Sequence, residues 1–98
     1  MTTITLESLR ARQAEILVVA ERWGARNVRV FGSVARGDAT ESSDVDFLVK
    51  FEPDRSLFDH GGLLMDLRDL LQRDVDVVSE AGLRSRFRER LLQEAVPL

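Results

Sequence analysis

Two short groups of residues in the first half of the chain have types and spacing suited to phosphate and metal chemistry. Gly32-Ser33 follows one hydrophobic run, and Asp44-x-Asp46 opens the next. Because residues i and i+2 of a strand point to the same face, Asp44 and Asp46 would aim two carboxylates in one direction, roughly 6.5 Å apart along the backbone. Adjacent carboxylates repel unless a cation or water separates them, and such oxygen ligands suit Mg²⁺.

The Gly32-Ser33 pair is a candidate phosphate-binding turn. A glycine lets the backbone approach a ligand closely, and a serine at a helix start offers its hydroxyl and nearby N–H groups to an anion. We expect a short helical segment over Ser33–Arg36 that ends at Gly37. Taken alone, the pair could equally be a plain turn with a capping serine. Its position ten residues before the Asp pair favours the phosphate role.

Three further residues could join this chemistry. Asp76 lies between valines in the run DVDVV, where burial of an unpaired carboxylate would be costly. It therefore lies either in solvent at the end of the sheet or beside Asp44 and Asp46. Asp74 is nearer the preceding loop, and we expect it to be solvated. His60 is the only histidine, and for it a partly exposed place at a helix start is the alternative to a catalytic role.

The remaining pattern predicts the elements that position these groups. Apolar residues recur at three- and four-residue steps over 6–23, about 57–72 and 82–95, which indicates helices. β-Branched and alternating runs indicate strands over 27–31, 44–51 and 74–78. With the short segment after Gly32, these elements predict an α/β (α+β) fold in which helices flank a small mixed sheet of about three strands.

Polar and small residues mark where the helices begin and end. Thr5 and Ser56 are candidate N-caps, Gly24 is a candidate stop, and Pro97 would end the last helix. We expect residues 60–62 (His-Gly-Gly) to interrupt the start of the second long helix. In the last helix, apolar residues recur at four-residue steps, at Leu83, Phe87, Leu91 and Ala95. Its arginines would form either a solvated face paired with glutamates of the same helix or a basic patch facing a partner.

Length and composition bound the class of protein. Ninety-eight residues predict a single domain, 1–98. The net charge of -3 argues against a protein that binds nucleic acid directly. The lack of cysteine excludes disulfides and thiolate metal sites. Neither a signal peptide nor an apolar run of membrane-spanning length is present, so we expect a cytoplasmic protein with no membrane contact.

The motif and the element order together resemble a known family. Gly32-Ser33, ten residues, Asp44-x-Asp46 and a lone Asp76 on a third strand resemble the DNA polymerase β-type nucleotidyltransferase superfamily. Within it, the stretch FGSVARGDATESSDVDFLV is similar to the minimal nucleotidyltransferase (MNT) proteins, which are the antitoxins of HEPN/MNT toxin–antitoxin pairs. The resemblance covers essentially the whole chain and implies a polymerase β-like core.

The resemblance also implies roles for individual residues. Gly32 and Ser33 would hold the triphosphate of ATP. Asp44 and Asp46 would bind divalent metals, with two Mg²⁺ ions expected, and Asp76 would bind one metal and help to activate the acceptor hydroxyl. Asp74 is a weaker candidate for that last role.

The implied function is AMP transfer from ATP to a hydroxyl, expected to be a tyrosine, of a partner HEPN ribonuclease toxin in a hetero-oligomer, which neutralises the toxin. The chain contains no tyrosine, so it cannot be its own tyrosine substrate. Two alternatives stay open. The protein could neutralise the toxin by binding alone, or it could be a small-molecule nucleotidyltransferase that completes its acceptor site by oligomerising.

Overall fold

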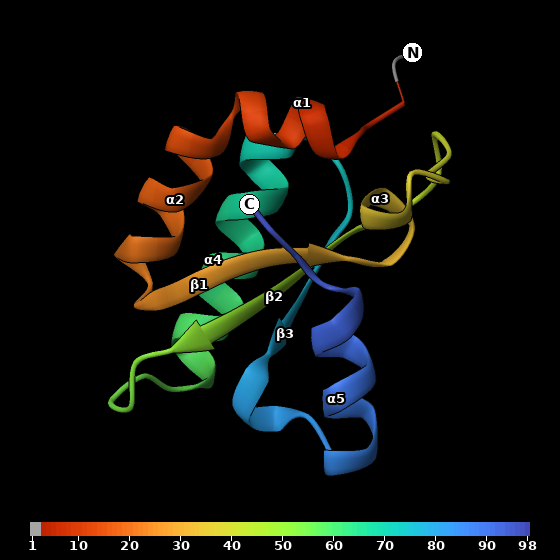
Figure 1. The fold of residues 1–98 in the computed structure, drawn as a ribbon. Coiled ribbons are helices and arrows are strands. Elements are labelled where there is room, and N and C mark those ends of the chain that lie inside the picture. The colour runs from red at the N-terminus through yellow and green to blue at the C-terminus, as the bar shows by residue number, and fades with distance from the viewer. Residues whose placement is uncertain (1–2) are drawn as a thin grey trace.

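A four-stranded mixed sheet forms the centre of the computed structural model, which describes residues 3–98. The strands are β1 (Ala25–Phe31), β2 (Val45–Phe51), β3 (Val75–Ser79) and β4 (Val96–Pro97). Their order in the sheet is β3-β2-β1-β4, and Figure 1 shows β2 between β3 and β1. β1 is antiparallel to β2 and β4, whereas β2 and β3 are parallel.

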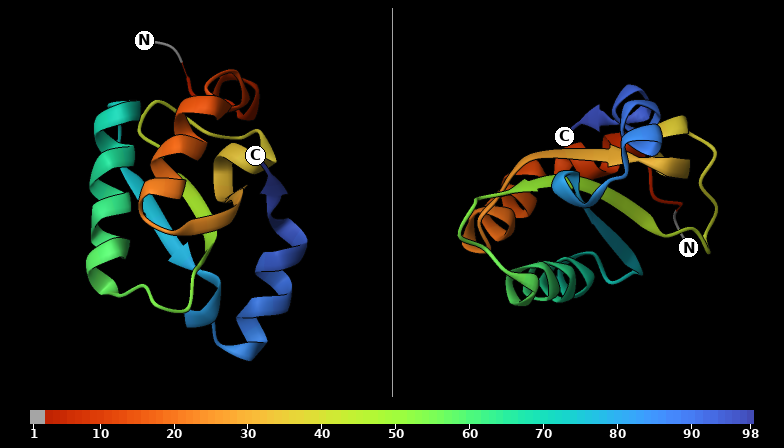
Figure 2. Two further views of the ribbon diagram at one scale, coloured as in Figure 1. Left: turned by 90° about the vertical axis from the view of Figure 1, so that its left-hand side faces the viewer. Right: turned by 90° about the horizontal axis from the view of Figure 1, so that it is seen from below.

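Helices lie on both faces of this sheet. They are α1 (Leu6–Ala11), α2 (Gln13–Arg22), α3 (Gly32–Arg36), α4 (Leu57–Leu71) and α5 (Ser85–Glu94), with a 3₁₀ turn, η1, at Glu80–Gly82. Figure 2 shows α2 and α4 on one face and α5 on the other. The predicted α/β class with a small mixed sheet is therefore confirmed. None of the helices in residues 3–98 is both long and apolar enough to span a bilayer.

The hydrophobic core lies between the sheet and the pair α2 and α4. Alternation along β2 turns Val45, Phe47 and Val49 to this side, and all three are at most 1% exposed. Ile16 of α2 and Leu63 of α4 close the core from the helix side and are fully buried. The apolar stripes predicted for these helices are therefore core-facing.

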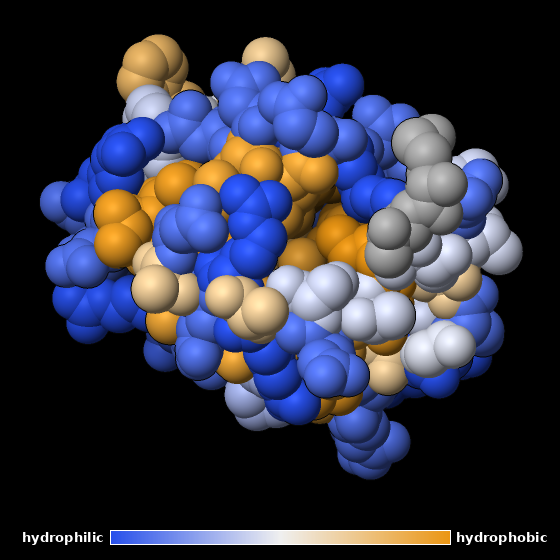
Figure 3. Space-filling model, turned by 90° about the horizontal axis from the view of Figure 1, so that it is seen from above, coloured by the Kyte–Doolittle hydropathy of each residue, from blue (hydrophilic) through white to orange (hydrophobic). Residues whose placement is uncertain are grey.

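One edge of this core reaches the surface. Viewed from the end where α1 lies, apolar side chains gather within a border of polar ones (Figure 3). A hollow of about 230 Å³ there is lined in part by Ile4, Leu9 and Leu71.

The opposite face of the sheet is only partly covered. Leu48 points to this side and is fully buried, and its partners in register are Arg29 on β1 and Val78 on β3. Arg29 is 8% exposed and forms a 2.6 Å ion pair with Glu80 of η1, which lies beside β2. The residues of β2 that would serve chemistry share this face, because Asp46 is two residues from Leu48.

The predicted helix caps are confirmed. Thr5 and Ser56 each form a capping box, in which the hydroxyl accepts a backbone N–H and the third helical residue accepts the N–H of the cap. Gly24 follows α2 with a φ of +72°, as expected of a stop signal. The hydrogen bond from the Ser56 N–H is the main cause that lowers the pKa of Asp59.

Several predicted boundaries are wrong. The helix expected over 6–23 is two helices that meet at Arg12, and the apolar spacing runs through the break because Leu9 and Ile16 are both buried. Residues 60–62 do not interrupt α4. The strand expected from Asp44 begins at Val45, so Asp44 lies just outside it.

The C-terminal prediction also needs correction. The last helix begins at Ser85 and not at 82. None of its residues is buried, and Phe87, one of its large apolar side chains, is 50% exposed. The helix ends at Glu94, and Pro97 belongs to β4, which was not predicted. A two-residue strand gives no periodic signal, and a proline is tolerated there because β4 is an edge strand.

Candidate active site

The register of the sheet brings together the residues singled out in the sequence. Asp46 on β2 is paired with Asp76 on parallel β3, and on its other side with Phe31, the last residue of β1. Gly32 follows Phe31 directly, so the predicted phosphate turn begins beside Asp46. Three segments far apart in sequence thus meet at one end of the sheet.

Gly32 is required by both its conformation and its surroundings. Its φ of +73° lies in the left-handed region, which residues other than glycine rarely adopt. A Cβ at this position would collide with Oδ2 of Asp46. The turn therefore presents bare backbone to the Asp46 carboxylate. Gly37, at a φ of +81°, ends α3 as predicted.

Electrostatics couples the three candidate carboxylates. The pKa of Asp46 is raised to about 6, first by partial burial, then by the negative charges of Asp76 and Asp44. Arg36 acts in the opposite direction, but not strongly enough to cancel these effects. Without a cation, the end of the sheet therefore holds an excess of negative charge next to a half-buried carboxylate.

This charge distribution fits a divalent cation. Within residues 3–98, no group of three or more Asp, Glu, His or Cys side chains lies close enough together to hold a metal ion by itself. Mg²⁺ does not need one, because it is usually held by one or two carboxylates and completes its shell with water and substrate phosphate. Asp46 and Asp76, which are partners in register, meet that requirement, and Asp44 lies two residues from Asp46.

The other candidates occupy different places. Asp44 is exposed just before β2, and Ser33 is half-buried in the first turn of α3. Asp74 is 75% exposed and its carboxylate pairs with Arg68 of α4 at 3.5 Å. The Asp74 carboxylate thus belongs to a surface ion pair, which agrees with the prediction that Asp74 is exposed to solvent.

His60 has a packing role. Its Nε2 lies 2.6 Å from the carbonyl oxygen of Val77, which can only accept, so Nε2 carries the proton and donates. The imidazole also packs against the ring of Phe51, with centroids 5.4 Å apart. His60 therefore ties α4 to the sheet near the end that is remote from Asp46.

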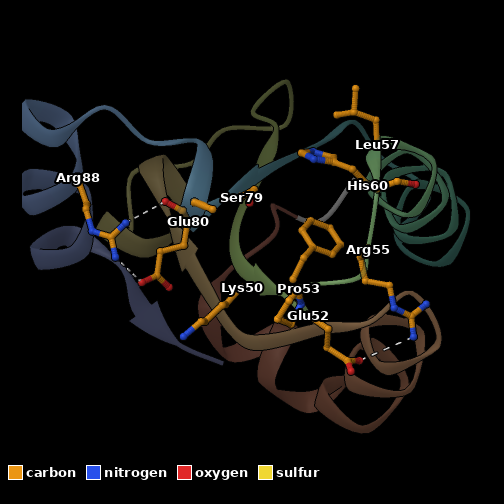
Figure 4. A pocket seen from close by; sticks show the side chains of 12 residues that line it. Lys50, Glu52, Pro53, Arg55, Leu57, His60, Ser79, Glu80 and Arg88 are labelled. Atoms are coloured by element: carbon orange, nitrogen blue, oxygen red, sulfur yellow. Dashed lines mark hydrogen bonds and ion pairs between the residues drawn. The ribbon is translucent and has the colours of Figure 1, made fainter.

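A hollow of about 500 Å³ at that remote end has a different character. Figure 4 shows Arg88 paired with Glu80 on one side of it and Arg55 paired with Glu52 on the other. Charges of both signs line it, and His60 is the one candidate residue among its lining, which includes neither Gly32-Ser33 nor the three candidate carboxylates. The carboxylate end differs from this hollow, because Asp46 lies there among like charges that Arg36 offsets only in part.

Sequence reasoning missed one residue at the carboxylate end. Glu94, the last residue of α5, accepts hydrogen bonds from the Gly32 N–H at 3.2 Å and from Arg36 Nη1 at 2.6 Å. Arg36 also contacts Asp38 at 3.4 Å, and its pKa is raised, mainly by the Glu94 hydrogen bond. Glu94 is 62 residues from Gly32 in sequence, so no local pattern could have revealed the contact.

Comparison with known proteins bears on this geometry. A family model described as the nucleotidyltransferase domain matches residues 16–98, most of the chain. The chain belongs to the nucleotidyltransferase domain family. This nucleotidyltransferase domain is 40% identical over 97 residues to the protein adenylyltransferase MntA of Thermococcus cleftensis, and the match covers 98% of both chains. The family predicted from the Gly-Ser and Asp-x-Asp motifs is thus confirmed.

Solved structures extend the likeness. One, assigned as a minimal nucleotidyltransferase, is 53% identical with a TM-score of 0.88, and the match covers both chains completely. Another belongs to the Shewanella oneidensis complex of a tri-AMPylated HEPN toxin with an MNT antitoxin. That match has a TM-score of 0.68 at 16% identity over 90% of this chain and 69% of the other, which shows a shared fold alone.

Proposed function

We propose that this nucleotidyltransferase is an antitoxin that transfers AMP from ATP to a hydroxyl group, expected to be a tyrosine, of a partner HEPN toxin and thereby neutralises it. The observation that carries the proposal is the pairing of Asp46 with Asp76 across parallel strands, beside the bare backbone of Gly32. The 40% identity to a protein adenylyltransferase over nearly the whole of both chains supports a protein as the acceptor.

The residues have distinct tasks in this proposal. The acceptor oxygen attacks the α-phosphorus of ATP, the bond to the bridging oxygen breaks, and pyrophosphate leaves. Gly32 and Ser33 hold the phosphates that leave, because the turn offers backbone N–H groups without an intervening side chain. Asp76, which is exposed beside Asp46, accepts the proton of the acceptor hydroxyl. Most of the rate enhancement would come from positioning and from electrostatic stabilisation.

Mg²⁺ would be held by Asp44, Asp46 and Asp76, and when bound it would supply positive charge to the attacking and leaving oxygens. The raised pKa of Asp46 supports this assignment, since a cation would offset the repulsion from Asp76 and Asp44. Three carboxylates carry enough charge for two ions.

Incubation with labelled ATP, Mg²⁺ and the HEPN partner tests the proposal. We expect label on the partner with the natural protein and none with Asp44→Asn or Asp76→Asn. Asp74→Asn is the matched control, because it removes the same charge two residues from Asp76 but from a side chain that faces Arg68. Undiminished labelling by Asp44→Asn would refute the assignment. Protection of cells without any labelling would favour neutralisation by binding alone.

A further inference from the structure

Glu94 occupies the Gly32 N–H, which the proposed function reserves for nucleotide phosphate, and also holds the guanidinium of Arg36 beside it. One oxygen of its carboxylate, Oε1, accepts from both the Gly32 N–H and the guanidinium of Arg36. A backbone N–H and an arginine that converge on one anionic oxygen also form the usual recognition pattern for a phosphate oxygen. The end of α5 thus already places an anion in the turn.

We propose that Glu94 is an internal competitor of the nucleotide, an inference that rests on the proposed function. In the nucleotide-free protein its carboxylate closes the turn, and a triphosphate can engage Gly32 and Arg36 only after Glu94 has moved away. Glu94 therefore sets the apparent affinity for ATP without contacting the reacting atoms.

The fold indicates how the turn would open. Directly after Glu94, β4 is fixed to β1, and the Leu98 N–H donates to the carbonyl oxygen of Val28 at 3.1 Å. Arg10 anchors the same segment through a 2.8 Å hydrogen bond to the carbonyl oxygen of Pro97. Because the backbone is held there, opening requires rotation of the Glu94 side chain and not departure of α5. That side chain is 29% exposed, so it has a path to solvent.

Once Glu94 has moved away, the Gly32 N–H and the guanidinium of Arg36 would be free to bind phosphate. Arg36 is 53% exposed and keeps Asp38 as a second partner when Glu94 leaves, so it stays anchored near the turn. The closed arrangement is consequently a modest preference that a triphosphate can overcome.

Binding of a non-hydrolysable ATP analogue with Mg²⁺, measured by calorimetry, tests the competition. An ion pair of this exposure shifts an equilibrium by up to about fivefold. We therefore expect Glu94→Ala to bind the analogue about threefold to fivefold more tightly than the natural protein. Glu89→Ala, which removes a charge from the exposed face of the same helix, should leave the affinity within about 1.5-fold.

A double-mutant cycle separates direct competition from general charge removal. If Glu94 competes through Arg36, Glu94→Ala will tighten binding much less in an Arg36→Gln background, because the closed state is already weakened there. If Glu94 acts only through long-range repulsion, the gain will be the same in both backgrounds. In NMR spectra without nucleotide, we also expect the Gly32 amide resonance to move in Glu94→Ala but not in Glu89→Ala.

The outcomes distinguish this inference from the proposed function. Unchanged or weaker analogue binding by Glu94→Ala, together with AMP transfer by the natural protein, would overturn the competitor role and leave the enzyme intact. If neither protein binds the analogue at millimolar concentration, both the function and the inference are wrong.

Discussion

Asp46→Asn should stabilise the metal-free protein while abolishing AMP transfer. Burial and the neighbouring carboxylates raise the pKa of Asp46 from 3.8 to about 6. A raised pKa means that the folded state prefers the protonated form, so the stability that Asp46 contributes is fully present below about pH 4 and is lost as the pH rises through about 6. At pH 8 the folded protein carries an unfavourable charge that asparagine does not have.

The size of the effect follows from the shift. A change from 3.8 to about 6 corresponds to at most about 3 kcal/mol, since one pKa unit is about 1.4 kcal/mol. Asp46 is only half-buried, and solvent screening reduces the expected gain to about 1–2 kcal/mol. At pH 4.5 Asp46 is largely protonated when folded but largely ionised when unfolded, so the gain should fall to about a third of its value at pH 8.

Urea unfolding in the presence of a chelator at pH 4.5 and pH 8 measures this difference. Asp74→Asn is the control, because the Asp74 side chain is 75% exposed and its replacement should change stability little at either pH. A stability change for Asp46→Asn that is the same at both pH values would refute the reasoning. It would show that the negative charge of Asp46 does not destabilise the folded protein.

Three further predictions concern the turn, the buried ion pair and a helix cap. Gly32→Ala and Gly37→Ala should each cost about 1–2 kcal/mol of unfolding free energy in left-handed strain, but only Gly32→Ala, which displaces the adjacent carboxylate, should abolish AMP transfer. Glu80→Gln should cost about 2–4 kcal/mol because Arg29 stays buried without its charged partner. Because the pKa of Glu80 is lowered, mainly by the Arg29 hydrogen bond, its contribution is present above about pH 4.5 and is lost in more acidic solution, which thermal unfolding against pH will show. Ser56→Ala should lower the unfolding free energy by about 1 kcal/mol in urea titrations through loss of the α4 cap.

Local patterns predicted much of the fold because they report local physics. The caps at Thr5 and Ser56 follow from side chains that can accept a nearby N–H, and the alternation along β2 follows from burial of one face. The break at Arg12 could not be predicted, because the same apolar spacing serves one helix or two. Long-range pairing sets β4, so its two residues carried no signal of their own.

The candidate site shows the same division. The spacing of Gly32 and Asp46 predicted that the turn and the carboxylates belong together, and the register with β3 now places Asp76 opposite Asp46. The sequence favoured Asp76 over Asp74 only because Asp74 lies near a loop, since strand register decides which of them lies opposite Asp46. The contact of Glu94 with the turn depends on how α5 packs against the sheet. The sequence of α5 alone does not predict this contact.

We propose that one end of the sheet binds a divalent cation and the nucleotide phosphates together. A crystal structure of the protein with Mn²⁺, which prefers the same oxygen ligands as Mg²⁺, and a non-hydrolysable ATP analogue tests it directly through the anomalous signal of the metal. We predict Mn²⁺ against Asp46 and Asp76, with a phosphate oxygen on the Gly32 N–H and Glu94 turned away. Mn²⁺ and nucleotide bound instead in the hollow near His60, with Glu94 still on Gly32, would contradict the claim.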